Sequence, residues 1–156
     1  MRFYGLTDRG KQRENNEDCI YVCNVTDELK LFIVADGMGG ANAGEVASKD
    51  AMNSIEGYIK SEFPKIEHDK EDIELLISKA IKRANKYIYE KAKAIPKYEG
   101  MGTTIVVVLI YKGKAYIGHV GDSRVYRFRK HVIRQLTKDH SYVQELVKEG
   151  SITKEE

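Results

Sequence analysis

Carboxylates beside glycines are the residues of this sequence best suited to chemistry. Asp36 follows the apolar run 31–35 and is followed at once by Gly37. A carboxylate that ends a buried strand is costly unless it is paired, and a divalent cation that prefers oxygen ligands is a suitable partner. Glycine also lets the backbone reverse sharply and approach a ligand closely. These features predict a cation site, although an Asp-Gly turn with a solvated carboxylate is the simpler explanation of Asp36 taken alone.

A second group of charged side chains precedes the segment 19–25. Glu17 and Asp18 supply further oxygen ligands of the kind that Mg²⁺ and Mn²⁺ prefer. Arg13, five residues before Asp18, can reach the same pocket and offer a bidentate fork to a phosphate. Asp122 stands in a Gly-Asp-Ser-Arg sequence between two predicted strands. Each of these groups is only a charged turn when it is read in isolation.

A dinucleotide-binding loop is the competing interpretation of the glycines after Asp36. A strand, a Gly-x-Gly-Gly sequence and a helical pattern do occur there in order. However, Asn42 takes the place of the third glycine, and Asp36 would direct a negative charge at the pyrophosphate. We therefore favour the cation site.

Alternating strand and helix patterns must position these side chains. Apolar periodicity, prolines and turn residues predict strands, then two helices, then a β meander. The predicted strands are 2–8, 19–25, 31–35, 103–111, 114–120, 124–129 and 132–136, and the predicted helices are 43–62, 71–94 and 141–149. The segments 31–35 and 103–111 are apolar on both faces, so each is expected to be covered on both sides.

Composition limits the classes of function. The 156 residues suit one domain, and the net charge of +2 gives no general attraction to nucleic acid or to an anionic membrane. No apolar run is long enough to span a bilayer, so a cytoplasmic location is expected. The basic, aromatic segment 124–134 could suggest RNA binding, but an exposed strand with extended arginines explains it better. Cys19 and Cys23 are expected to be free thiols in a reducing compartment.

Five short motifs in order distinguish between these interpretations. They are Arg13…Asn16-Glu17-Asp18; Val34-Ala35-Asp36-Gly37-Met38-Gly39-Gly40…Gly44-Glu45…Ala47-Ser48; Gly102-Thr103-Thr104; Gly121-Asp122-Ser123-Arg124; and Leu136-Thr137…Asp139-His140-Ser141. In combination and spacing, the chain resembles the metal-dependent protein phosphatases of type 2C, specifically their compact bacterial branch, over essentially its whole length. The resemblance implies an α+β fold, an α/β/β/α sandwich of two antiparallel sheets flanked by helix pairs.

The resemblance also implies roles for the residues singled out above. Asp36 would bridge two Mn²⁺ or Mg²⁺ ions, with the Gly37 carbonyl on one of them. Asp18 would bind the second ion, mostly through ordered water, with Glu17 in support. Asp122 would help to hold a third, weaker ion.

The activity implied is hydrolysis of phosphoserine and phosphothreonine in proteins. Two neighbouring ions lower the pKa of a shared water, and the hydroxide so formed attacks phosphorus directly. Arg13 would bind the substrate phosphate and neutralise its growing charge. Phosphoproteins and a cognate Ser/Thr kinase are therefore the expected partners, and no nucleic acid or membrane is expected.

Two departures from the family pattern qualify these expectations. Met38 stands where many eukaryotic members have a histidine thought to protonate the leaving group. The later Ser-Asp-Gly and Asp-Asn segments, each of which gives a metal aspartate, are absent. In addition, the sequence 153–156 matches a capping box that announces a further helix.

These departures lead us to expect that residues 1–156 are the N-terminal portion of a single catalytic domain. On that view the chain by itself binds metal poorly and is inactive. It should also self-associate or pair with a missing C-terminal piece. The alternative is a non-catalytic module that binds phosphoproteins or a kinase.

Overall fold

The structure, a computed structural model, describes residues 1–39 and 43–140. In chain order its elements are β1 (Asp18–Asn24), β2 (Leu29–Met38), α1 (Ala43–Glu62), η1 (Phe63–Lys65), α2 (Lys70–Ala94), η2 (Pro96–Tyr98), β3 (Gly102–Thr103), β4 (Ile105–Tyr111), β5 (Lys114–Val120), β6 (Tyr126–Arg129) and β7 (Val132–Gln135). The predicted helices 43–62 and 71–94 are confirmed. The predicted helix 141–149 and the capping box lie outside the described residues.

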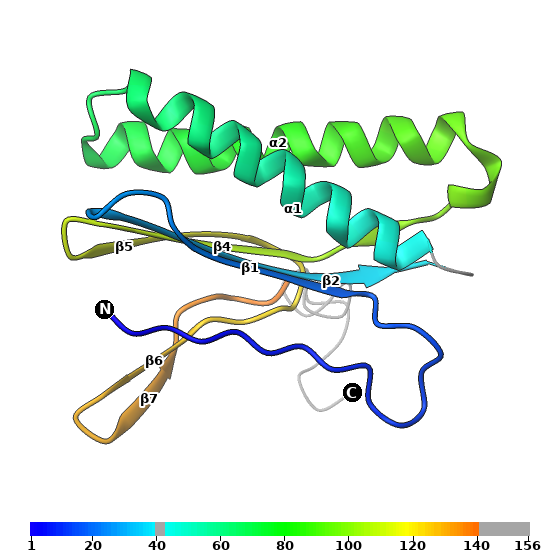
Figure 1. The fold of residues 1–156 in the computed structure, drawn as a ribbon, viewed down its shortest axis with the longest axis horizontal. Coiled ribbons are helices and arrows are strands. Elements are labelled where there is room, and N and C mark those ends of the chain that lie inside the picture. The colour runs from blue at the N-terminus through cyan, green and yellow to red at the C-terminus, as the bar shows by residue number, and fades with distance from the viewer. Residues whose placement is uncertain (40–42, 141–156) are drawn as a thin grey trace, which may run out of the picture.

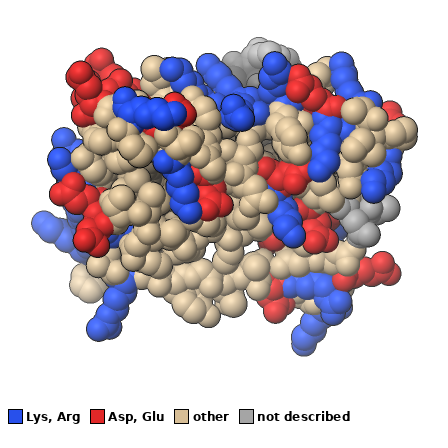
Figure 2. Space-filling model, turned by 45° about the horizontal axis from the view of Figure 1, so that its top comes forward, with Lys and Arg blue, Asp and Glu red and all other residues tan. Residues whose placement is uncertain are grey.

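Both helices form where the apolar side chains recur every three to four residues. In α1 the stripe Ala47, Ala51, Ile55 and Ile59 is almost completely buried. In α2 the side chain of Asp69 caps the first turn by accepting a hydrogen bond of 2.7 Å from the Asp72 amide. The outer faces carry ion pairs of opposite charge one turn apart, so Lys, Arg, Asp and Glu side chains are mixed over the side seen in Figure 2.

The larger sheet lies directly beneath this helix layer (Figure 1). Its strand order is β1-β2-β4-β5, all neighbours are antiparallel, and the short β3 pairs with the end of β2. Leu29, Leu31 and Ile33 point from β2 into the core formed with α1 and α2, each at most 1% exposed. This layer positions the residues of the candidate site.

Two tight hairpins occupy the two-residue gaps between predicted strands. Lys112 and Gly113 join β4 to β5, and Lys130 and His131 join β6 to β7, all four with positive φ. Two consecutive residues with positive φ match the twist of the strands that they connect. The β6–β7 hairpin is a separate sheet on the side of the larger sheet opposite the helices (Figure 1).

The first residues depart from the prediction. The expected strand 2–8 is wrong. Residues 2–8 form no hydrogen-bonded ladder with the described residues beside them, and contact those residues through side chains instead. Phe3 packs edge-on against Phe32, with ring centroids 5.6 Å apart. Gly5 lies against the Ile20 side chain. The segment therefore crosses the open face of β1 and β2 as extended chain.

The α+β class and the antiparallel sheets are confirmed, and the described residues supply a helix pair and two sheets of the expected sandwich. Coverage of 31–35 on both faces is not observed, because Val34 is 42% exposed although Ile33 is buried. No helix among the described residues is long and apolar enough to cross a membrane.

Candidate metal and phosphate site

Two aspartates from adjacent strands form the centre of the candidate site. Asp18 on β1 and Asp36 on β2 are direct partners in the antiparallel register. Residues directly opposite each other project from the same face of a sheet and lie close together. Ala35 is buried under the helices, so Asp36 belongs to the other face, where both aspartates are exposed.

The pKa of Asp36 shows that other carboxylates gather around it. Partial burial raises this pKa most, followed by the charge of Asp18 and a side-chain hydrogen bond with it, and then by the charges of Asp122 and Glu17. Each of these effects disfavours the ionised form. The structure thus brings together carboxylates from three separate parts of the sequence, namely Glu17 with Asp18, Asp36 and Asp122, and concentrates negative charge at Asp36.

The position of Asp36 within β2 differs from the prediction. The strand was expected to end at Ala35, but it continues to Met38. The reason is an additional partner, because β3 pairs Thr103 with Gly37. Beyond β3, Thr104 accepts a hydrogen bond of 3.1 Å at Oγ1 from the Asp36 amide and donates its own amide to the Asp36 carbonyl at 2.8 Å. Asp36 is therefore held in a strand rather than in a turn.

Thr104 also connects Asp36 to the loop that carries Asp122. Its hydroxyl lies 2.7 Å from the Ser123 hydroxyl, and the Thr104 side chain is buried. Gly121 has a φ of +98°, and a Cβ placed there would lie 2.7 Å from the Thr104 methyl group. The motifs around residues 102–104 and 121–123 are thus the two sides of one contact, which positions Asp122 near Asp36.

The backbone of Glu17 joins β2 to the start of α1. Its carbonyl accepts hydrogen bonds from the Gly37 amide at 3.1 Å and from the Ser48 hydroxyl at 2.6 Å. A Cβ on Gly44 would lie 2.5 Å from Glu17 Oε1, and a Cβ on Gly37 would lie 2.1 Å from the Gly44 carbonyl oxygen. Gly37 is needed for this close approach and not for a chain reversal, since it is not among the residues with positive φ. The Glu17 carboxylate consequently lies at the first turn of α1, where a helix favours negative charge.

Arg13 is less clearly placed. It is exposed in the loop before β1, and no ion pair holds its guanidinium among the residues that the structure describes. No hydrogen bond or ion pair of Arg13 with Asp18 or Asp36 is present in that part of the chain. The side chain is available to a ligand, and its role in phosphate binding stays a prediction.

The carboxylates of the described residues do not form a complete metal-coordination site by themselves. Within residues 1–39 and 43–140, no three Asp, Glu, His or Cys side chains lie close enough together to hold a metal ion as a group. The arrangement nevertheless has the right chemistry for a divalent cation, with two opposed aspartates and repulsion that a cation would relieve.

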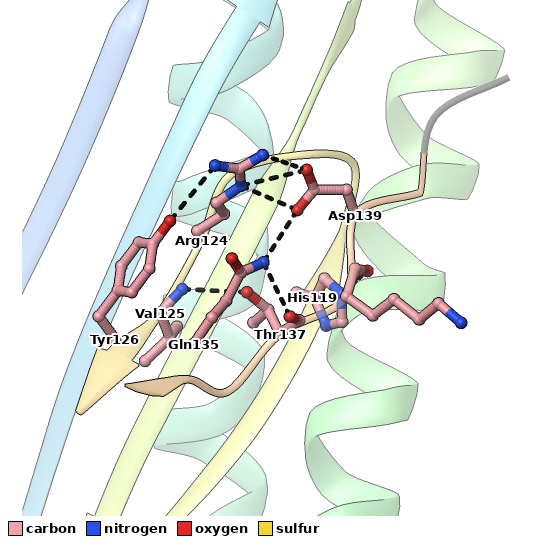
Figure 3. A network of polar contacts seen from close by, with 8 residues as sticks. His119, Arg124, Val125, Tyr126, Gln135, Thr137 and Asp139 are labelled. Carbon is pink, nitrogen blue, oxygen red and sulfur yellow. Dashed lines mark hydrogen bonds and ion pairs between the residues drawn. The ribbon is translucent and has the colours of Figure 1, made fainter. Parts of the chain in front are cut away.

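A network that sequence reasoning missed fixes the segment after β7 (Figure 3). Asp139 accepts hydrogen bonds from Arg124 Nε at 3.0 and 3.1 Å and from Nη2 at 2.6 Å, and the guanidinium lowers the pKa of this carboxyl. Thr137 Oγ1 accepts from the Val125 amide at 3.1 Å, and Gln135 donates to Asp139 at 3.2 Å. The predicted helix 141–149, which begins two residues after Asp139, lies outside the described residues. The only sequence signal for this network is that Arg124 and Asp139 belong to two of the five ordered motifs.

The two cysteines are free, as predicted. Cys19 Sγ lies 3.3 Å from Met52 Sδ, between β1 and α1. Burial raises the pKa of the Cys19 thiol, which disfavours a thiolate.

Comparisons with known proteins bear on the family of this chain. A family model described as protein phosphatase 2C matches residues 7–154. The serine/threonine phosphatase stp of Listeria monocytogenes serovar 1/2a is 42% identical over 150 residues, which are 96% of this chain and 59% of that protein. The crystal structure of the serine/threonine phosphatase Stp1 from Staphylococcus aureus has a TM-score of 0.83 and 37% identity, and the match covers 96% of this chain and 58% of that one.

A further solved structure bears on the metal. The catalytic domain of the serine/threonine protein phosphatase PstP, in complex with two manganese ions, matches with a TM-score of 0.75 and 36% identity, over 95% of this chain and 60% of that one. The chain thus spans about three fifths of the length of these relatives. The family match and the shared fold lead to one conclusion: this chain belongs to the protein phosphatase 2C family.

Proposed function

We propose that this chain is the N-terminal portion of one catalytic domain that hydrolyses phosphoserine and phosphothreonine in proteins with the help of divalent metal ions. Its relatives named serine/threonine phosphatases support the substrate class. The coverage of about three fifths of their length, together with a second sheet of two strands among the described residues, supports the view that further chain completes the domain.

The observation that carries the proposal is the pairing of Asp18 with Asp36. Two carboxylates in direct register, with Asp122 and Glu17 near enough to raise the pKa of Asp36 further, repel one another unless a cation lies among them. Hard oxygen ligands suit Mn²⁺ and Mg²⁺, and the manganese complex of PstP favours this class of ion. Such ions, when bound, supply a metal-activated water as the nucleophile.

The position of each residue indicates its proposed role at the metal ions. Asp36 lies between Asp18 and the Asp122 loop, so it is the side chain best placed to be shared by two ions. The Gly37 carbonyl would be a further ligand of one of these ions. Glu17, which lies against the first turn of α1, would support an ion indirectly, through a bound water.

Arg13 and Asp122 have the more peripheral roles. Arg13, exposed and free of an ion pair among the described residues, would bind the substrate phosphate through its planar fork. Asp122 would contribute to a third, weaker ion. A cognate Ser/Thr kinase, which phosphorylates the same proteins, is the expected functional partner.

The 156-residue chain alone should have little activity. The described residues hold two opposed aspartates but no ready group of three ligands, so at least one further ligand must be added for tight binding. This observation also favours the second candidate, a non-catalytic module that binds phosphoproteins or a kinase. The two candidates differ in whether a longer protein that contains this chain turns over a phosphate ester.

The test uses a longer protein in which this chain is followed by the rest of the catalytic domain. Hydrolysis of p-nitrophenyl phosphate and of phosphothreonine peptides should require Mn²⁺ or Mg²⁺. Asp36→Ala should lower the rate by about 10³-fold or more, because it removes the shared ligand. Activity that survives EDTA would contradict the metal-dependent proposal, and the absence of any turnover would favour the binding module.

Arg13→Ala in the same protein separates substrate binding from chemistry. It should lower kcat/KM by an amount equivalent to about 2–3 kcal/mol of transition-state stabilisation. The loss should appear mainly in KM, since a guanidinium holds phosphate in both the ground state and the transition state. Lys11→Ala, in the same exposed loop, is the matched control. Equal kinetics for the two variants would place Arg13 outside the site.

A further inference from the structure

A large apolar cavity lies between α2 and the end of the larger sheet that bears β3. Its volume is about 1070 Å³. Ala84, Ile88 and Ala92 line it from the helix, and Met101, Ile105 and Val120 line it from the sheet side. Concave apolar sites of a few hundred to about 1,000 Å³ are the size that small organic ligands occupy. None of the roles proposed above for the phosphatase site uses these residues.

Charge is unevenly distributed over the wall of this cavity. It contains two ammonium groups, of Lys82 and Lys93, against the single carboxylate of Glu99. Among the described residues neither lysine forms an ion pair, and Lys93 Nζ lies 4.4 Å from the centre of the Tyr89 ring. An aromatic ring and two unpaired cations beside an apolar surface suit a ligand with a negative end.

We propose that this cavity is a binding site for a small amphiphilic anion, a molecule with an apolar ring system and one acidic group. The apolar body occupies the space between Ala92 and Ile105. The acidic group lies at the entrance near Lys82. Both parts are needed, because burial of the body supplies most of the affinity and the ion contact sets orientation and preference.

The site lies next to β3, the strand that holds Asp36 in place. Met101 and Gly102 line the cavity, Gly102 pairs with Met38, and the neighbouring Thr103 hydroxyl donates to the Asp36 carbonyl at 3.0 Å. A ligand seated here contacts the support of the proposed metal site without touching the carboxylates. Binding at the cavity does not depend on phosphatase activity, so the two proposals can fail separately.

The test measures binding of two matched fluorescent probes to the full 156-residue chain. The anionic probe is 8-anilinonaphthalene-1-sulfonate, and the neutral probe is N-phenyl-1-naphthylamine, the same ring system without the sulfonate. Both should bind, with one saturable site at which the anion is preferred. A titration without any saturable component would overturn the proposal.

A matched pair of tryptophan variants assigns that component to the cavity. Ala92→Trp fills the space, whereas Ala94→Trp places the same side chain on an exposed position of the same helix, outside the cavity. The first should weaken binding of both probes at least tenfold, and the second should change it less than twofold. Circular dichroism verifies folding, and Ala92→Leu replaces the tryptophan variant if the latter fails to fold. Equal binding in the variants at positions 92 and 94 would overturn the assignment.

A second pair tests the ion contact. Lys82→Gln should weaken binding of the sulfonate about fivefold and leave the neutral probe unchanged, because only the sulfonate interacts with the ammonium group. Lys79→Gln, three residues earlier on the same helix and not in the wall, should change neither. If Lys82→Gln and Lys79→Gln have the same effect on both probes, the acidic group is not part of the ligand class.

Discussion

The two faces of strand β2 differ sharply in how they are covered. On the helix side, Leu31, Ile33 and Ala35 of β2 are at most 1% exposed. On the other side, Val34 is 42% exposed and Met38 is 55% exposed, although they belong to the same strand. The β6–β7 hairpin adds Ile133, 68% exposed. The difference is confined to part of the sheet, because Val106 of β4, which pairs with Val34, is only 4% exposed.

This difference indicates where stability and function lie. The helix layer and the face beneath it form the buried core, and the pairing of β1 with β2 holds the backbone of Asp36 and Asp18 in register. The carboxylates themselves project from the other face, which in the described residues is bordered only by extended chain and one hairpin. The candidate metal site is thus supported on the helix side of the sheet and exposed on the other side.

The open face should cause the 156-residue chain to associate with itself. Exposed apolar surface and unpaired strand edges attract further copies. We expect light scattering combined with intact mass spectrometry to detect species larger than 17.8 kDa. Ile133→Lys should reduce association. Leu75→Lys, which also replaces an apolar side chain by a charged one but at a 50% exposed position in the helix layer, should not. A monodisperse monomer would contradict the comparison between the faces.

Adjacent residues of β2 provide a second test. Ile33→Ala should lower the free energy of unfolding by about 2–4 kcal/mol, because it leaves a cavity under the helices. Val34→Ala should lower it by about 1 kcal/mol or less, since its side chain is already partly in water. Chemical denaturation of both variants, at a concentration where one species is present, provides the numbers. Similar losses at the two positions would mean that both faces are covered.

Two glycines of α1 sharpen the comparison at the site itself. Gly44→Ala should cost about 1–3 kcal/mol of stability, because its Cβ would lie 2.5 Å from Glu17 Oε1 and 3.0 Å from the Gly37 carbonyl carbon. Gly57→Ala in the same helix, where nothing lies within 4 Å, should instead gain about 0.5–1 kcal/mol. Thermal unfolding of both variants measures the difference. A neutral Gly44→Ala would show that Glu17 is not held by α1.

Patterns that depend on neighbours in sequence were predicted well. The helices 43–62 and 71–94 follow from apolar periodicity, and the turns at 112–113 and 130–131 fall in the gaps between predicted strands. The strand 2–8 was predicted on the same local basis and is wrong. A strand also needs a hydrogen-bonded neighbour, and local sequence does not specify one.

The residues of the candidate site were named from sequence and their roles stay predictions, whereas the contacts that support them were not foreseen. The family resemblance named Asp18, Asp36 and Asp122. In the structure Asp18 lies opposite Asp36 in the sheet, and the loop of Asp122 contacts Thr104, which binds the Asp36 backbone. The continuation of β2 to Met38 depends on β3, more than 60 residues later in the chain. Contacts of this range follow from the fold as a whole, so no local pattern could reveal them.

Paramagnetic broadening by Mn²⁺ in amide NMR spectra of the ¹⁵N-labelled 156-residue chain tests the central claim most directly, because it detects weak binding and locates it. Substoichiometric Mn²⁺ should first broaden the amides of Asp18, Asp36, Gly37 and Asp122, and this selective loss should disappear in Asp36→Asn. Asp139→Asn, which removes a carboxylate held by Arg124 in the segment after β7, should leave the pattern unchanged. Broadening that begins elsewhere, or that is the same in Asp36→Asn as in the unsubstituted chain, would contradict a metal site built on Asp18 and Asp36.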